Sequence, residues 1–418
     1  MLSKQAKVLY ITYLGVLEAI PQSQVLPYLF GISKEVEIHL LSFEKKQLIK
    51  NMPDEFRQIK DILNEKKIAW HRLPYHKYPL VLSSFFDIFI GSIISLFLIV
   101  RYKISIVHAR SNIPIAIGFI LKLFSALTRD RLRFKLLYDR RGIMAEDHTE
   151  HSGWKRGGLL YCLAVWFEKK AIHRSNAITV LTERMNRHLR ETLNLEKDIL
   201  IKTIPCCIDL EKFNYDNNGN VKLRDSSGLR GKFVFVYSGS LGTYNLLGEM
   251  FDFFRLAVSM IPDAHFLILT QNKDIVVNML AKRQDIDSQR IILKHIPPDK
   301  VPVFLSLADV GLIFRRDSST AIASCPTKLG EYLACGLPVI SISKIGDVDE
   351  MLKSHKIGVI LNSYEASEYQ EAIGRLLFLL KEKDDLRKRC RNFSENYFSL
   401  ERGINAYLDI YSNLLEKR

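Results

Sequence analysis

The sequence alternates short apolar runs with longer amphipathic helical patterns, and no other feature restricts its possible folds so strongly. In the first half, apolar runs rich in β-branched and aromatic residues lie at 7–13, 36–42, 68–73, 104–108, 135–138 and 177–181. Helical patterns separate most of them, at 22–32, 54–65, 80–102, 112–127 and 156–174. Strand, helix and strand repeated in this way predict an α/β protein with a parallel, doubly wound sheet. Near-continuous apolar runs such as "KVLYI" agree, because such a sheet is covered on both faces.

A pause near residue 205 divides the chain into two similar parts. The stretch "IPCCIDLEKFNYDNNGNVKLRDSSGLRGK" is rich in Asn, Gly and Asp, which is typical of a linker. The alternation then restarts, with apolar runs "FVFVYSG", "HFLILTQ", "IILKHI", "DVGLIF", "PVISIS" and "GVIL". We therefore expect a second doubly wound sheet, followed by amphipathic helices over 367–418. A chain of 418 residues is long enough for two such cores.

The net charge of +14 is compatible with three kinds of partner: nucleic acid, an anionic substrate or an anionic membrane. A nucleic-acid-binding protein is the less favoured alternative, because the basic residues form no aromatic-interleaved stripe and no recognised binding motif. The six cysteines include no CxxC pair and no histidine at metal-ligand spacing. They are expected to be free thiols in a reducing compartment.

One apolar segment, residues 79–100, is long enough to cross a bilayer. Asp87 lies near its middle, where a charge costs about 2.5–3.5 kcal/mol on insertion scales. The strand candidates on either side of the segment should share one sheet, but a spanning helix would place them on opposite sides of a membrane. We therefore expect a helix that is buried against the sheet or that dips one face into lipid.

The stretch "CPTKLGEYLACGLPVI" (325–340) predicts a short helix at about 326–335 that begins just after a strand. Pro326 suits the first helical position and Gly336 the position after the helix end. The free amides and dipole of the helix start form an anion site, to which Lys328 adds a cation. Glu331, one turn further on, could accept hydrogen bonds from the two hydroxyls of a ribose. The alternative is an exposed ion pair between Lys328 and Glu331.

Two further strand ends in the second half carry residues suited to phosphate. Gly239-Ser240-Leu241-Gly242-Thr243 links a strand to a helix, and its small residues would let backbone amides approach a phosphate closely. Arg315 and Arg316 follow another strand and could clamp a diphosphate. The alternatives are a plain connecting turn and solvated loop arginines.

The stretch "SCPTKLGEYLACGLPVIS" resembles the nucleotide-sugar signature of family-4 glycosyltransferases, which are retaining enzymes of the GT-B fold. "GSLGTYNLLGEM", "IPCCIDLEKF", "VHARS" and "DRRG" look like a bacterial branch of that family that builds polysaccharides or lipid-linked glycans. The resemblance covers about residues 7–400. It implies two Rossmann-like domains facing across a cleft: an acceptor-binding domain at 1–205 and a nucleotide-sugar-binding domain at 206–395. A final helix at 396–418 would cross back to the first domain.

The resemblance also implies the roles of the donor-site residues. Glu331 would bind the ribose, and the remaining nucleotide-sugar-binding residues would be Gly239, Ser240, Gly242, Thr243, Arg315, Thr327 and Lys328. Neither a cofactor nor a metal is expected. Three positions depart from the family pattern, because Ala323 replaces a common Glu, Tyr244-Asn245 a common Lys, and Asp139-Arg140 a common His. These departures bear on the contacts to the donor sugar and on the catalytic base.

Two strand ends of the first half supply the catalytic candidates His108, Asp139 and Arg140. Arg110 and Arg141 lie beside them in the sequence. In glycosyl transfer the leaving diphosphate gains negative charge, and fixed positive potential around it gives the largest help. The alternative is a satisfied histidine with a structural Asp–Arg pair.

These observations predict a hexosyl-type glycosyltransferase that moves a sugar, with retention, from a nucleotide diphosphate sugar to a glycan or lipid-linked acceptor. The basic cluster Arg129, Arg131, Arg133 and Lys135, together with residues 79–100, favours peripheral attachment to an anionic membrane. The expected location is the cytoplasmic face of the bacterial inner membrane. The alternatives are a nucleotide-sugar epimerase or hydrolase of the same fold, which would favour a carboxylate-rich site, and the nucleic-acid-binding protein.

Overall fold

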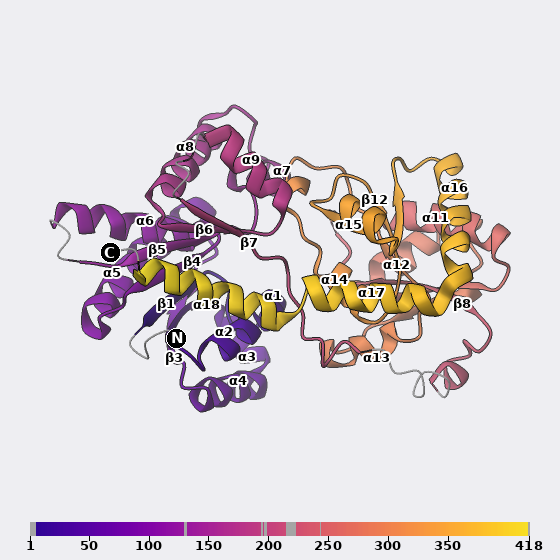
Figure 1. Cartoon of the computed structure of the whole chain (residues 1–418), viewed down its shortest axis with the longest axis horizontal. Helices are drawn as coiled ribbons and strands as arrows, with labels where there is room; N and C mark the ends of the chain where they lie inside the picture. The colour runs from indigo at the N-terminus through magenta and orange to yellow at the C-terminus, as the bar shows by residue number, and fades with distance from the viewer. Residues whose placement is uncertain are drawn as a thin grey trace. The chain divides into compact units, whose positions relative to one another are not determined.

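Two parallel β-sheets organise the chain, one in each of two units (Figure 1). The first unit comprises Met1–Pro205 with Leu400–Arg418, and the second comprises Cys206–Ser399. This computed structural model describes residues 6–128, 132–193, 195, 199–214, 223–242 and 244–416. The two predicted doubly wound sheets and the GT-B architecture of two Rossmann-like units are confirmed.

The sheet of the first unit has seven strands in the order β3-β2-β1-β4-β5-β6-β7. Their bounds are β1 Lys7–Thr12, β2 Glu37–Glu44, β3 Ala69–Pro74, β4 Ile106–Arg110, β5 Lys135–Asp139, β6 Ala177–Val180 and β7 Leu200–Thr203. The first six lie within two residues of their predicted bounds, whereas β7 is an additional edge strand. All pairs are parallel, and β1 pairs with both β2 and β4. The strand order therefore reverses beside β1.

Ten helices are described in the first unit. They are α1 Ala19–Gln24, α2 Leu26–Ile32, α3 Lys46–Asn51, α4 Pro53–Glu65, α5 Leu80–Tyr102, α6 Asn112–Leu127, α7 Met144–His151, α8 Leu159–Arg174, α9 Glu183–Leu193 and α18 Leu400–Glu416. Figure 1 shows α18, in yellow, among the indigo and purple elements of this unit. It packs against α2, where Ile404 closely approaches Gly31.

The last helix begins at Leu400 rather than at residue 396, because α17 continues to Tyr397. Phe398 and Ser399 then leave the helical path. The Ile208 amide donates to the Phe398 carbonyl at 2.8 Å, and Ser399 forms a bridge with Ile208. These contacts hold the segment between the helices within the second unit.

Helix α5 confirms the helix predicted over 80–102, and it connects β3 to β4. The Asp87 side chain of α5 accepts hydrogen bonds from the Tyr13 hydroxyl at 2.8 Å and from the His76 amide at 3.2 Å. By length and composition, Leu82–Tyr102 is the one helix among the described residues that could cross a membrane. However, β1 and β4, before and after α5, are hydrogen-bonded neighbours in one sheet. A spanning α5 would have to break that sheet.

The sheet of the second unit has six strands in the order β10-β9-β8-β11-β12-β13. Their bounds are β8 Phe233–Ser238, β9 Ala264–Leu269, β10 Ile291–Lys294, β11 Val310–Ile313, β12 Val339–Ile342 and β13 Gly358–Leu361. Its principal helices are α11 Leu247–Met260, α12 Lys273–Leu280, α13 Val301–Leu305, α14 Thr327–Ala334, α15 Val348–His355, α16 Ala366–Leu379 and α17 Lys383–Tyr397. Buried apolar clusters cover both faces of this sheet. The strand order reverses between β8 and β11, where ligands bind in doubly wound sheets.

Helix α14 is the short helix predicted at 326–335. Pro326 is its N-cap, with an extended backbone, and Thr327 is its first helical residue. After the helix ends, Gly336 has a φ of +71°, a left-handed conformation that glycine adopts without steric cost. Buried Tyr332 packs closely on Gly311 of β11, and its hydroxyl accepts a hydrogen bond from the Ser238 amide at 2.8 Å. These contacts place the start of α14 beside the ends of β8 and β11.

Candidate functional site

The candidate nucleotide site lies at the carboxyl ends of β8 and β11, where the strand order of the second sheet reverses. Three segments meet there: the Gly-rich turn after β8, the loop after β11 and the start of α14. Gly239, Ser240, Gly242, Arg315, Thr327, Lys328 and Glu331 all belong to these segments. Thr243, the eighth candidate, lies outside the described residues.

The Gly-rich turn is held by polar side chains around it. The Ser240 carbonyl accepts from the Tyr237 hydroxyl at 2.6 Å and from the Asn245 amide group at 3.0 Å. Gly239 has a φ of +133°, a conformation that side chains rarely adopt. A Cβ added there would lie 3.3 Å from the Lys328 Nζ. The Gly-rich turn therefore lies directly beside the first turn of α14. This is the arrangement expected if both contribute to one anion site.

Lys328 lies partly buried over the Tyr237 ring, with its Nζ 4.0 Å from the ring centroid. It has no ion-pair or hydrogen-bond partner for its side chain among the described residues. Loss of hydration, together with the nearby Arg315 guanidinium, lowers the pKa of Lys328 to about 7. The neutral amine of Lys328, present in part near pH 7, is therefore poised to take up a proton when an anion binds. This differs from the permanent cation expected from the sequence.

Glu331, one turn along α14, is also partly buried, and its carboxylate has no bonded partner in the described part of the chain. Burial raises the pKa of Glu331 to about 7, although the nearby Lys328 lowers it in part. Lys328 and Glu331 do not form the ion pair that was the alternative interpretation of this motif. Two ionisable groups are thus left available for a ligand at the start of one helix.

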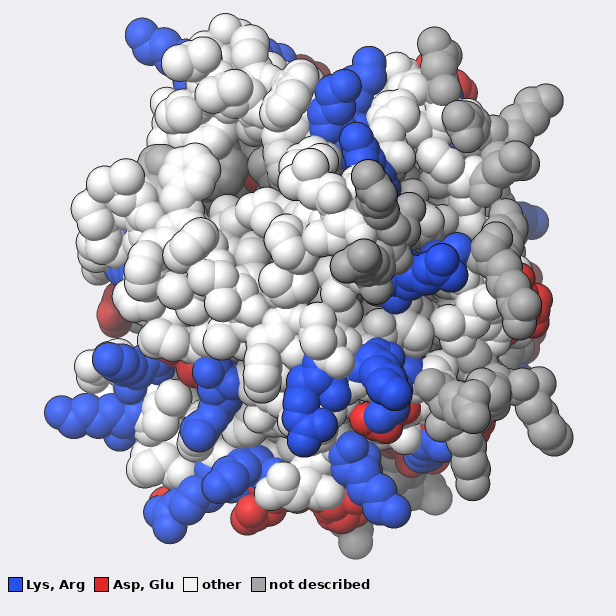
Figure 2. All heavy atoms as spheres, turned by 90° about the vertical axis from the view of Figure 1, so that its left-hand side faces the viewer, with Lys and Arg blue, Asp and Glu red and all other residues white. Residues whose placement is uncertain are grey.

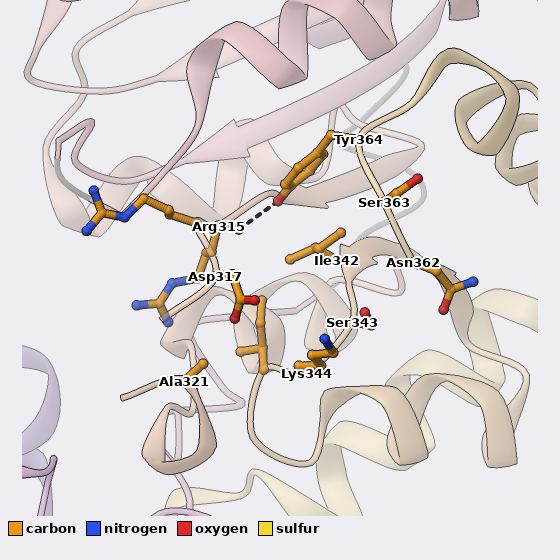
Figure 3. A pocket seen from close by; sticks show the side chains of 11 residues that line it. Arg315, Asp317, Ala321, Ile342, Ser343, Lys344, Asn362, Ser363 and Tyr364 are labelled. Atoms are coloured by element: carbon orange, nitrogen blue, oxygen red, sulfur yellow. Dashed lines mark hydrogen bonds between the residues drawn. The ribbon is translucent and has the colours of Figure 1, made fainter. Parts of the chain in front are cut away.

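Arg315 lies at the end of β11 and is fixed on several sides. Its guanidinium hydrogen-bonds the Ser324 hydroxyl and lies 5.1 Å from the centroid of the Tyr244 ring. The Tyr364 hydroxyl donates to the Arg315 carbonyl at 2.7 Å, drawn as the dashed line in Figure 3. A pocket of about 140 Å³ lies beside this residue, lined also by Arg316, Lys344 and Asn362 (Figure 3). Arg315 and Arg316, which follow β11, therefore line a pocket at the carboxyl ends of the strands.

The catalytic candidates His108, Asp139 and Arg140 lie in the first unit, at the ends of β4 and β5, and all three are buried. The His108 Nδ1 lies 2.7 Å from the Tyr411 hydroxyl of α18. The Arg140 Nε donates to a Glu168 carboxylate oxygen at 2.8 Å. No more than 4% of any of the three residues is exposed, so none reaches solvent in this conformation.

Asp139 is the centre of this buried network. Arg110 and Arg141 form ion pairs with it at 3.2 and 2.8 Å, and the Thr179 hydroxyl donates to it at 2.7 Å. Burial alone would raise the pKa of Asp139, but Arg141, His108 and Arg110 together hold it well below its usual range. Burial also lowers the pKa of His108, so its imidazole is neutral. Of the two interpretations left open by the sequence, burial and the ion pairs of Asp139 favour the structural one. The buried His108 Nε2 and Arg140 Nη1 atoms have no hydrogen-bond partner among the described residues, and a catalytic role stays a prediction.

The described residues were also searched for metal ligands, and two tyrosines of the candidate site were not predicted from the sequence. No group of three or more His, Cys, Asp or Glu residues suited to a metal occurs in the described ranges. Tyr237 and Tyr332 were not predicted as site residues, although an aromatic residue before the Gly-rich turn was visible in "FVFVYSG". The Cys206 amide also donates to the Cys325 Sγ at 3.4 Å, so the start of the second unit contacts the residue before the N-cap of α14.

Known proteins resemble this chain in part of its sequence and in its fold. The sequence model of a family described as "Glycosyl transferases group 1" matches residues 221–396. No curated protein matches the chain in sequence.

Three solved structures illustrate the likeness of fold. Sucrose-phosphate synthase from Thermosynechococcus elongatus is 14% identical, with a TM-score of 0.71 over 99% of this chain and 100% of its own. HepE of Anabaena in complex with UDP is 13% identical, with a TM-score of 0.69 over 97% and 100%. A glycosyltransferase from Rickettsia africae is 14% identical, with a TM-score of 0.68 over 99% of both chains. At these identities the likeness shows the fold. The chain thus has the GT-B fold, and its second unit matches glycosyl transferases group 1.

Proposed function

We propose that this protein is a retaining glycosyltransferase that moves a hexosyl group from a nucleotide diphosphate sugar to an acceptor. The observation that carries the proposal is the pairing of Lys328 and Glu331 on α14. Both side chains are partly buried without a bonded partner among the described residues, beside a Gly-rich turn. An ammonium at the helix start and a carboxylate one turn on match the diphosphate and ribose of a nucleotide. HepE, solved with UDP and with UDP-glucose, shows that a protein of this fold binds such a donor.

The chemistry follows from the charge that develops on the leaving group. As the glycosidic bond to the diphosphate breaks, negative charge grows on the phosphate oxygens. Lys328, protonated on anion binding, and Arg315 would stabilise that charge together with the amides at the start of α14. We propose that these groups replace a metal. Retention fits attack on the face from which the diphosphate leaves, which depends on positioning more than on a protein nucleophile.

The acceptor and the location are part of the same proposal. A glycan or lipid-linked acceptor on the cytoplasmic face of a bacterial inner membrane would bring this basic protein to an anionic surface. Juxtamembrane basic residues contribute about 1 kcal/mol each near such a surface. Arg133 and Lys135 of the predicted basic cluster are described, whereas Arg129 and Arg131 lie outside the described residues.

The decisive experiment is binding of nucleoside diphosphates to Glu331→Gln, measured by calorimetry beside the unaltered protein. Hydrogen bonds to a charged group contribute about 1.5–3 kcal/mol each, so affinity should fall by about tenfold to a hundredfold or more. Glu350→Gln, at an exposed position of α15, is the matched control and should bind as the unaltered protein does. Equal affinities of Glu331→Gln and the control would show that the ribose assignment is wrong.

A transfer assay then separates the alternative activities. A panel of nucleotide sugars should give a glycosylated acceptor, whereas a hydrolase would release free sugar and an epimerase would return an isomer of the donor. Transfer should persist in the presence of a chelator. Activity that is lost with chelator and restored by manganese would contradict the metal-free proposal.

A further inference from the structure

The outward face of α5 is entirely apolar between residues 82 and 100. Its exposed positions among the described side chains are Leu82, Phe85, Phe86, Phe89, Ile93, Phe97 and Val100. Their exposed fractions run from 48% at Ile93 to 67% at Leu82. The spacing of three and four residues puts them on one side of the helix. Isolated exposed apolar residues are ordinary, but a continuous stripe of this length marks an interaction surface.

The buried side of α5, by contrast, carries four polar residues, with Leu98 and Ile99 buried near its end. Ser83, Asp87, Ser92 and Ser95 all face the protein. The Ser92 hydroxyl donates to the Ile88 carbonyl at 2.7 Å, and the Asp87 carboxylate lies 2.6 Å from the His76 Nδ1. A helix on a water-facing surface has the opposite arrangement, with polar residues outside. The outward face of α5 therefore suits a non-aqueous environment.

The apolar surface continues from α5 onto α6 and α8. α5 packs along α6, where Gly91 closely approaches Ile117, and the Phe119 and Phe167 rings of α6 and α8 are 5.5 Å apart. Exposed apolar residues on these two helices include Phe124, Leu127, Leu159, Leu163 and Trp166. Figure 2 shows the resulting broad white area on this side of the molecule.

The exposed charged residues of α5, α6 and α8 themselves are basic. The only acidic residues in α5, α6 and α8 are Asp87 and Glu168, and both are buried. Exposed cations lie at the two ends of α5 and on the second half of α8: Lys77, Arg101, Lys103, Arg133, Lys169 and Lys170. Figure 2 shows blue side chains gathered along the edges of the white area. An apolar surface bordered by cations is complementary to the acyl chains and anionic headgroups of a bilayer.

We propose that the apolar face of α5, α6 and α8 is seated in a phospholipid bilayer containing anionic lipids, with α5 in the plane of the membrane. This deepens the peripheral attachment proposed above and rests on it. The phenylalanines enter the acyl boundary and Trp166 lies at the headgroup level. A hollow of about 360 Å³ at the end of α5, lined by Val100, Lys103 and Arg133, accommodates a lipid phosphate. In this proposal, insertion of apolar side chains contributes most of the membrane-binding free energy, and the basic residues contribute less.

Self-association through this face is disfavoured by the same charges. In a twofold dimer the same patch faces itself, so the cationic edges of two copies would oppose one another. A bilayer with anionic headgroups instead supplies the opposite charge. The bilayer is therefore the occupant that matches both the apolar area and its border.

Vesicle flotation of the double variant Phe85→Glu/Phe89→Glu tests this proposal. Both positions are exposed, so the fold should tolerate the change. The matched control is Phe378→Glu, an equally exposed phenylalanine (69%) on α16 of the second unit. On vesicles of phosphatidylglycerol and phosphatidylcholine, the unaltered protein and the control should bind at low salt and keep a substantial bound fraction at high salt. The double variant should bind about tenfold more weakly and lose the salt-resistant fraction.

A second measurement separates this inference from the proposed function. Nucleoside diphosphate affinity of the double variant should equal that of the unaltered protein, because the candidate donor residues lie in the second unit. Flotation of the double variant as strongly as the unaltered protein would overturn the membrane face. The same conclusion follows if the unaltered protein floats only at low salt. It also follows if the unaltered protein binds no vesicles but forms dimers, and the double variant is monomeric. None of these outcomes changes the nucleotide affinity of Glu331→Gln, which is the measurement that tests the proposed function.

Discussion

Two side chains of α14, Lys328 and Glu331, both have a pKa of about 7, reached from opposite directions. Lys328 binds a phosphate only as the ammonium, and Glu331 accepts two hydroxyl hydrogen bonds best as the carboxylate. Raising the pH above 7 removes the Lys328 proton, and lowering it below 7 protonates Glu331. Each change weakens donor binding, so the site has its highest affinity where the two titrations cross.

A bell-shaped pH dependence of donor affinity is therefore expected, with its maximum near pH 7. On either side the affinity should fall by up to about tenfold per pH unit, since one proton must be taken up or released on binding. Calorimetry with a nucleotide diphosphate sugar from about pH 5.5 to about pH 9 measures this, because neither phosphate diester of such a ligand titrates there. Lys328→Met should remove the alkaline limb and Glu331→Gln the acidic one. An alkaline limb that persists in Lys328→Met would show that another group binds the phosphate.

At the same scale, the sequence predicted that the candidate donor-site residues lie together, but not their electrostatic state. Helix-start chemistry and spacing were sufficient to place Lys328, Glu331 and Gly239 in one region. The absence of an ion pair on α14 depends on how Tyr237 and Arg315 pack around it, and side-chain packing cannot be derived from spacing. For His108, Asp139 and Arg140, strand ends predicted the position correctly, whereas their burial required the tertiary structure: the Tyr407 and Tyr411 rings contact His108, and Glu168 pairs with Arg140.

Among the elements, long apolar strands were predictable and short polar ones were not. β7, Leu200–Thr203, has only one fully buried residue, so its sequence lacks the apolar run that identified its neighbours. α5 was predicted as a helix because of its length. Its orientation, with serines and Asp87 inward, is decided by the polar partners of Asp87: His76, just before the helix, and Tyr13, which lies far from it in the sequence.

The end of α14 offers a test at the scale of one element, Gly336→Ala. Left-handed backbone costs a residue with a Cβ about 1–2 kcal/mol, and the nearest atom would be Cβ of Arg387 at 3.4 Å, so backbone strain is the only penalty. The melting temperature should fall by about 2–8 °C for a unit of this size. The control Gly374→Ala, in the interior of α16 with no atom within 4 Å of the added Cβ, should stabilise by about 0.5–1 kcal/mol. Equal melting temperatures for the two variants would contradict this reasoning.

Over the whole molecule, the donor site and the buried arginine network belong to different units. Tyr411→Phe removes the hydroxyl that hydrogen-bonds the neutral His108 and leaves the buried His108 Nδ1 unpaired. Leaving this buried ring nitrogen unpaired should cost the first unit about 1–3 kcal/mol of unfolding free energy, measured by urea denaturation. Nucleoside diphosphate affinity should be unchanged, and Tyr78→Phe, at a 75% exposed position, should alter neither quantity. A loss of nucleotide affinity in Tyr411→Phe would show that the network acts on the donor site.

The return of α18 to the first unit also affects how the protein is made. During translation, residues 1–205 leave the ribosome before the second unit and well before α18. Until then, His108 and Arg141 lack Tyr411 and Tyr407, and Gly31 of α2 lacks Ile404. At about 5–20 residues per second, this interval lasts on the order of ten to forty seconds. Throughout it the nascent first unit exposes the surface that α18 later covers, so the earlier-made half of this protein is the later one to finish folding.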